Sequence, residues 1–194
     1  MKSLFLFVLL FSFSVYSESY QDLTFDKLQS MAESDDEVAM SVLAEAYDKG
    51  KGVEQDSNQA FKWYKRAAEL NYAPAQYNLA VLLNKGLAVK QDLEQSFFWT
   101  EKSAEQNYTP AQFLLASFYA QGQGTFTNKK QAAKWYRIAA EQENSMAQFN
   151  LAIMLIKGDG IAKNEKEGLK WLQKAADNHH AQAISVLKMI KDAR

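Results

Sequence analysis

The chain has 194 residues, of which 47% are hydrophobic and 23% are charged, and its formal net charge is −1. There is no basic excess of the kind that binds nucleic acid, so no nucleic-acid partner is predicted. The absence of cysteine excludes disulfides and leaves stability to packing.

Residues 1–17 have the features of a secretory signal peptide. Lys2 precedes an apolar run from Leu4 to Phe11, and Val15 and Ser17 fit the small-residue rule for a cleavage site. The run is shorter than the roughly 20 apolar residues of a transmembrane helix. We therefore predict cleavage after Ser17, export to the periplasm or beyond, and no stable membrane insertion of the mature chain. An uncleaved membrane anchor is the alternative.

A period of 36 residues runs through the rest of the chain. It separates the only four tryptophans, which are Trp63, Trp99, Trp135 and Trp171. The same step separates Gly50, Gly86, Gly122 and Gly158, and alanine and leucine columns keep the same spacing. Repetition at this period is typical of tandem arrays of one supersecondary unit.

The period divides the chain into a half-unit, four full units and a final helix. Residues 18–38 form an N-terminal helix that is a degenerate half-repeat. The repeats are residues 39–74, 75–110, 111–146 and 147–182, and residues 183–194 form a C-terminal capping helix. Lys188 and Lys191 stand where the second unit has Ala80 and Leu83. A terminal cap needs such a polar outer face because no further repeat covers it.

Each unit is predicted to contain two helices. The first runs from about Ala75 to Lys85 in the second unit and stops at Gly86, since glycine reaches the left-handed C-cap conformation without a Cβ clash. Pro74 and Pro110 fit the first turn of a first helix. The second helix starts at an N-cap, namely Asp56, Asp92, Asn128 or Asn164. Gln59, Gln95, Gln131 and Glu167 follow three residues later, as in a variant capping box.

The tryptophans are predicted to fill the core beside paired alanines such as Ala139 and Ala140, which let two helices approach closely. On this interpretation, Trp135→Ala costs about 3–5 kcal/mol. The same change at Trp171, beside the cap, costs less.

The segments Gly50-Lys51-Gly52-Val53-Glu54-Gln55-Asp56 and Ala60-Phe61-Lys62-Trp63-Tyr64-Lys65-Arg66-Ala67-Ala68-Glu69 resemble the Sel-one-like repeat, a branch of the tetratricopeptide type. The resemblance covers roughly residues 22 to 193. It implies an all-α, right-handed α/α superhelical solenoid of helix-turn-helix repeats that holds other proteins, often in export, envelope or host-contact roles. Ala88 replaces the second loop glycine of its unit, so we expect a local change in loop geometry there.

Residues for chemistry are scarce. His179 and His180 are the only histidines, and their spacing matches no recognised metal site, so we expect a solvated turn. With no cysteine in the chain and no histidine besides this adjacent pair, no nucleophile–base pair of the usual kind is expected. No catalytic residue, metal or cofactor is predicted. The alternative is a peptidoglycan-related cell-envelope enzyme or enzyme regulator that acts through carboxylates. A scaffold is favoured because no unit carries an inserted acidic loop.

By analogy with tetratricopeptide arrays, the first helices should line a concave groove with the stripe i, i+4, i+7. An aromatic column with a polar rim suits a protein or peptide partner. The alternative is that the aromatic residues pack between neighbouring first helices. The predicted partner-binding residues are Tyr77, Val81, Asn84, Lys85, Phe113, Ser117, Gln121, Phe149, Ile153 and Lys157.

Overall fold

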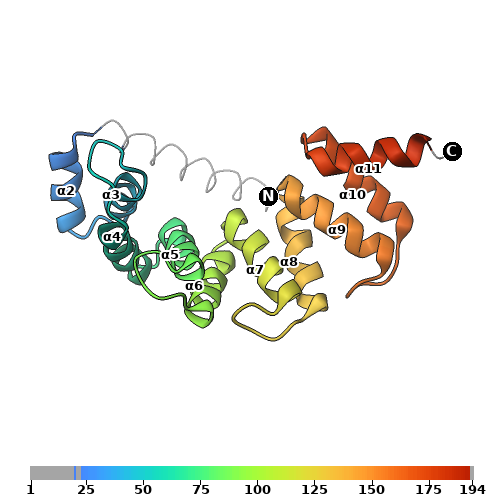
Figure 1. Cartoon of the computed structure of the whole chain (residues 1–194), viewed down its shortest axis with the longest axis horizontal. Coiled ribbons are helices and arrows are strands. Elements are labelled where there is room, and N and C mark those ends of the chain that lie inside the picture. Colours follow the sequence, from blue (N-terminus) through green and yellow to red (C-terminus); the bar gives the residue numbers. More distant parts are fainter. Residues whose placement is uncertain (1–19, 21–22, 193–194) are drawn as a thin grey trace, which may run out of the picture. The chain divides into compact units, whose positions relative to one another are not determined.

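The computed structural model describes residue 20 and residues 23–192, and the predicted signal peptide at residues 1–17 lies outside them. This part of the chain contains ten α-helices and no strand (Figure 1). The predicted all-α class of helix-turn-helix repeats is therefore confirmed. The helices form two compact units that divide between Gln91 and Asp92, and each unit is described by itself.

The first unit holds four helices: α2 (Phe25–Glu33), α3 (Glu37–Lys49), α4 (Ser57–Glu69) and α5 (Ala73–Lys85). Each helix packs against the next one along the chain. Its core is made of small and medium residues, and Ala32, Leu43, Ala67 and Leu79 are no more than 1% exposed. Small side chains at these positions allow close approach of the helix axes.

The second unit holds six helices: α6 (Leu93–Glu105), α7 (Thr109–Gln121), α8 (Lys129–Glu141), α9 (Ser145–Lys157), α10 (Glu165–Asp177) and α11 (Ala181–Asp192). Consecutive helices again pack together. One core cluster includes Tyr136 and Leu151, and a second includes Ala152, Leu172 and Ala183. The odd-numbered helices are the first helices of the repeats, and the even-numbered ones are the second helices.

The first helices start about two residues earlier than the predicted Ala75, since α5 begins at Ala73. Pro74 then lies in the first turn, where a missing N–H leaves no hydrogen bond unmade. The glycine C-caps are confirmed, because Gly50, Gly86, Gly122 and Gly158 have φ between 67° and 76°.

The predicted capping box forms only in one direction. The side chains of Asp56, Asp92, Asn128 and Asn164 accept backbone N–H groups at the N2 or N3 positions. The N–H of the cap residue is already taken, because Asn128 N donates to Tyr119 O and Asn164 N donates to Leu155 O, both at 2.8 Å. The N3 side chain therefore does not accept the backbone N–H of the cap residue, although Glu167 Oε2 accepts from the side-chain Nδ2 of Asn164 at 3.1 Å. The cap residue instead ties its helix to the preceding one.

The predicted change in loop geometry at Ala88 is wrong. Ala88 has φ 67°, within the 67–72° of Gly52, Gly124 and Gly160. The loop backbone therefore has the same conformation as in the other repeats. Because Ala88 has a Cβ, this left-handed conformation is strained there, unlike at a glycine. Space also differs between the loops. A Cβ on Gly124 would lie 2.0 Å from Leu93 O, whereas one on Gly52 would meet nothing within 4 Å.

The tryptophans are half-buried, so the prediction of a fully buried aromatic position is only partly right. The adjacent column faces inward instead, and Tyr64 is 3% and Tyr136 6% exposed. Successive helical residues differ by about 100° in direction, so the two columns cannot both face the core. Cations lie over the rings of Trp63, Trp135 and Trp171, and the shortest of these distances is 4.5 Å, from Lys174 Nζ to the Trp171 ring centroid.

Candidate functional site

The stripe predicted on α7 combines packing with hydrogen bonding. The Phe113 ring lies 5.8 Å from the Tyr136 ring of α8. Ser117 Oγ donates to the Phe113 carbonyl oxygen and lies 3.1 Å from the Tyr136 hydroxyl. Either hydroxyl can be the donor in that second pair. Burial raises the pKa of Tyr136, and its hydrogen bond with Ser117 acts in the opposite direction. These contacts fix Phe113 and Ser117 against α8.

On α9 the equivalent aromatic residue contacts the following helix. The Phe149 ring stacks on His180 with centroids 4.7 Å apart and planes 19° apart. His180 Nδ1 accepts the backbone N–H of Ala183, which caps the start of α11. The prediction of a solvated turn is thus wrong for His180, which is half-buried, whereas His179 is exposed. Both aromatic residues of this unit's stripe have a packing role.

The C-terminal ends of the two stripes are different in character. Gln121 and Lys157 are exposed at the last positions of α7 and α9, and Ile153 is half-buried. Neither polar side chain forms a hydrogen bond or ion pair with any residue that the structure describes. Each stripe therefore runs from a fixed aromatic ring to a polar group open to solvent.

In the first unit, the predicted residues on α5 also become more exposed toward the C-terminal end of the helix. Tyr77, Val81 and Asn84 are half-buried, and Lys85 is exposed. Burial raises the pKa of Tyr77. The Asn84 backbone carbonyl accepts from Gln91 Nε2 at 2.6 Å, which anchors the loop after α5. The structure thus places these four residues along one helix of this unit.

A column of buried glutamines was not identified from the sequence. Gln76, Gln112 and Gln148 are 1–2% exposed and recur every 36 residues in otherwise apolar first helices. Their Nε2 groups donate to backbone carbonyl oxygens at the ends of second helices, as Gln148 Nε2 does to Ala140 O at 3.1 Å. The regular glutamine among alanines and leucines was the signal that could have revealed them.

These amides also join successive repeats in the second unit. Gln142 Nε2 donates to Gln112 Oε1 at 2.7 Å, and Thr109 Oγ1 donates to Gln142 Oε1 at 2.6 Å. One repeat later, Asn178 Nδ2 donates to Gln148 Oε1 at 3.1 Å. Hydrogen bonds in a poorly solvated setting have strict geometry, so they hold adjacent repeats in register.

The two carboxyl groups with a shifted pKa, Glu167 and Glu45, each pair with cationic side chains. Arg137 Nη1 donates to Glu167 Oε1 at 2.6 Å, and Trp171 Nε1 donates to the same oxygen at 3.4 Å. The Arg137 hydrogen bond holds the pKa of Glu167 below its ordinary value. Burial acts to raise the pKa of Glu45, but the effects of Lys49 and Lys51 together are larger, so this pKa is below its ordinary value. The described residues hold no group of three or more His, Asp or Glu side chains suited to a metal ion.

These helix hairpins, with repeated caps and an interlocking polar column, define an α/α repeat protein. The Sel1 repeat model matches residues 38–72, 73–108, 109–144 and 145–180. The chain therefore belongs to the Sel1 repeat family. Sel1 repeats commonly act as scaffolds for protein interactions. No curated protein matches the chain.

Several solved structures share the fold. A Sel1 repeat protein from Oxalobacter formigenes has 29% identity and a TM-score of 0.77, over 84% of this chain and 65% of that one. The protective antigen c5321 of uropathogenic Escherichia coli has 31% identity and a TM-score of 0.83, over 86% and 36%. Helicobacter pylori cysteine rich protein B has 25% identity and a TM-score of 0.54, over 71% and 98%. The chain thus spans less than two thirds of the first two relatives.

Proposed function

We propose that this protein is an exported, non-enzymatic scaffold that binds a protein or peptide through the polar ends of its first helices. The proposal rests on the change along each stripe from a packed aromatic ring to an exposed polar side chain. At one end Phe113 and Phe149 are fixed by aromatic contacts. At the other end, Gln121 and Lys157 are exposed and unpaired among the described residues. Polar groups on rigid helices lose little conformational entropy on binding.

The test replaces Asn84, Gln121 and Lys157 with alanine together. The expected result is an unchanged melting curve and loss of the partners that the wild-type chain captures from envelope extract. The matched control replaces Asn58, Gln95 and Lys130, which are exposed near the starts of second helices. If the control set abolishes capture and the first set does not, binding belongs to the second helices.

Export is supported by Lys2 and the apolar run from Leu4 to Phe11. None of the described helices is both long and apolar enough to cross a bilayer. Mass spectrometry of the protein from its native host should give a chain that starts at Glu18 or within two residues of it. A full-length mass recovered from the membrane fraction would contradict export with processing.

The alternative, a cell-envelope enzyme or regulator, has less support. A general acid at neutral pH needs a raised carboxyl pKa. The described carboxyl groups with shifted pKa values, Glu45 and Glu167, are both lowered by cationic neighbours. The scaffold therefore remains the better supported function.

A further inference from the structure

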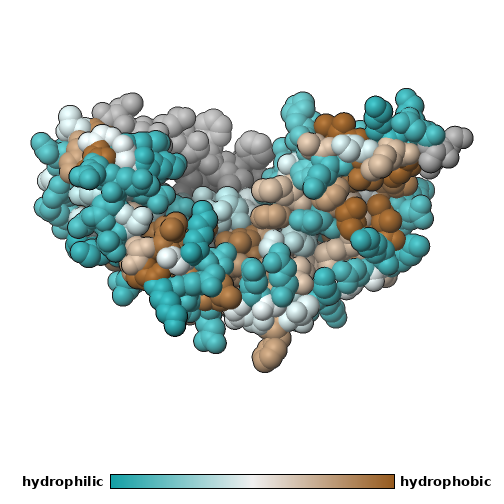
Figure 2. All heavy atoms as spheres, in the orientation of Figure 1, coloured by the Kyte–Doolittle hydropathy of each residue, from teal (hydrophilic) through white to brown (hydrophobic). Residues whose placement is uncertain are grey.

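An apolar groove of about 680 Å³ lies between α10 and α11 in the second unit. Figure 2 shows apolar surface over these helices, bordered by hydrophilic groups. The groove is lined by side chains of both helices, and its charged groups are Asp177, Lys188 and Lys191. The Asp177 carboxylate accepts from Gln173 Nε2 at 2.8 Å, and the apolar lining of the groove includes Leu169, Ile184 and Leu187. Ile184 is 48% exposed, which is high for an aliphatic side chain beside a core.

The repeat indicates what kind of element fits this groove. In this unit α8 covers α7, and α10 covers α9. On α9, Ala152 clusters with Leu172 and Ala175 of α10, and Leu155 O accepts from the N-cap of α10. Ala152 and Leu155 are at most 1% exposed as a result. No described helix covers the same face of α11.

Two substitutions in the repeat give this face its charge. One period after Ala152 and Leu155 stand Lys188 and Lys191, both exposed. Neither forms a hydrogen bond or ion pair with any residue in the described part of the chain. A helix that packed here with apolar or basic side chains opposite the lysines would leave buried charges unpaired, which is costly. A helix with carboxylates opposite them would not.

We propose that the groove between α10 and α11 binds an acidic amphipathic helix of a partner protein. The apolar stripe of that helix lies against Leu169, Ile184 and Leu187, in the helix-in-groove mode. Its carboxylates pair with Lys188 and Lys191. This surface is separate from the first-helix polar ends of the proposed function and does not depend on them.

A second copy of the chain fits less well. The helix with the appropriate register is α2, and its residues equivalent to Gly168, Leu172 and Ala175 are Thr24, Leu28 and Met31. None of the three is acidic, and Leu28 is already buried in its own unit at 4% exposure. The charge of the groove therefore favours a different chain.

The test uses two labelled peptides with the sequence of residues 164–178, the segment that includes α10. One carries glutamate and the other lysine at the position of Leu172, which clusters with Ala152 of α9. Fluorescence anisotropy with the full chain should show the acidic peptide binding about tenfold more tightly, because its glutamate pairs with the groove lysines whereas the lysine of the other peptide is repelled by them. Lys188→Glu with Lys191→Glu should remove this preference.

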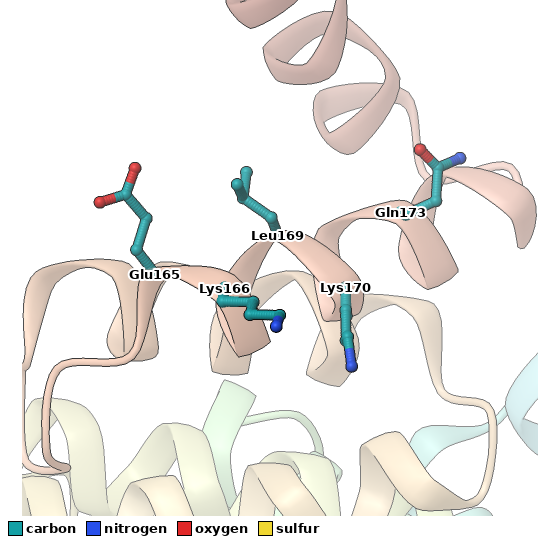
Figure 3. Close-up of a pocket in the computed structure, with 5 residues that line it drawn as sticks. All are labelled: Glu165, Lys166, Leu169, Lys170 and Gln173. Atoms are coloured by element: carbon teal, nitrogen blue, oxygen red, sulfur yellow. The ribbon is translucent and has the colours of Figure 1, made fainter.

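The control variant is Lys166→Glu with Lys170→Glu. Figure 3 shows these lysines beside Leu169 and Gln173 on α10 but pointing to a different side, and neither lysine lines the groove, so the change in net charge is matched while the groove lining is unchanged. The control should retain the preference, and circular dichroism should show that both variants fold. Equal binding of the two peptides, binding of neither, or equal loss in both variants would overturn the proposal. So would sedimentation showing concentration-dependent dimers that Lys188→Glu with Lys191→Glu dissociates, since a second copy would then be the occupant.

Discussion

At the scale of single residues, the buried glutamines show how polar side chains are kept inside an apolar array. A buried amide is tolerated only if its donor and acceptor are both satisfied. Gln112 meets this condition with Gln142 on one side and Ala104 O on the other. The equivalent pair in the first unit is Met40 and Leu70. The repeat therefore accepts two amides or two apolar residues at these positions.

This pairing predicts strong coupling between Gln112 and Gln142. Gln112→Met alone should cost about 1–3 kcal/mol, because the Gln142 amide loses its acceptor in a half-buried place. Gln112→Met with Gln142→Leu recreates the Met40 and Leu70 pair and should recover about half of that loss or more. Urea unfolding of the two single variants and the double variant forms the required cycle. Additive losses would show that the amides do not stabilise one another.

At the scale of helices, the sequence predicted what local chemistry decides. Glycine C-caps, the Asp and Asn N-caps and the proline positions depend on a few adjacent residues, and the structure has them all. The sequence could not decide between the columns of Trp135 and Tyr136, because both are large aromatic residues on one helix. It also missed the cap at His180, although Asp36 and Asn144 cap the equivalent helices through their side chains and only Tyr72 and Tyr108 do not. Which predicted stripe residues bind a partner stays a prediction.

The ion pair between Arg137 of α8 and Glu167 of α10 predicts that stability depends on pH. The pKa of Glu167 is lowered from its ordinary value near 4.5 in the folded chain, chiefly by the Arg137 hydrogen bond. A lowered folded pKa means that the contribution is present above the unfolded pKa and is lost as pH falls through the folded one. The pair is about one third exposed, so solvent screening limits its contribution to about 0.2–1 kcal/mol.

Glu167→Gln should therefore reduce the free energy of unfolding at pH 7 and have little effect well below pH 4.5. Glu141→Gln is the control, since that carboxylate is exposed on the neighbouring helix. Guanidinium unfolding is unsuitable because the salt screens the pair, so urea is the denaturant. A difference between wild type and Glu167→Gln that is the same at both pH values would exclude the ion pair as its cause.

At the scale of the second compact unit, helices contact their neighbours along the chain, so damage should spread through shared interfaces. The two tryptophans of this unit differ in this respect. Trp135 packs against the cluster around Tyr136 and Leu151, whereas Trp171 packs against that cluster and the one around Ala152 and Leu172. Trp171 thus joins the two cores. The sequence predicted a smaller loss of stability for Trp171→Ala because Trp171 lies beside the C-terminal cap. Contact with both clusters argues against that reason.

We therefore expect Trp171→Ala to cost at least as much as Trp135→Ala. Each should lose about 1.5–3 kcal/mol, less than for full burial, because the rings are only half-buried. The two variants should also differ in which helices lose protection from hydrogen exchange. Trp171→Ala should lower protection in α8 and α9 and also in α10 and α11, because it loosens both clusters. Trp135→Ala should leave α11 protected as in the wild type. If Trp171→Ala exposes only α10 and α11, the ring belongs to the terminal cluster alone, and the two cores are joined by the Gln148 hydrogen bonds instead.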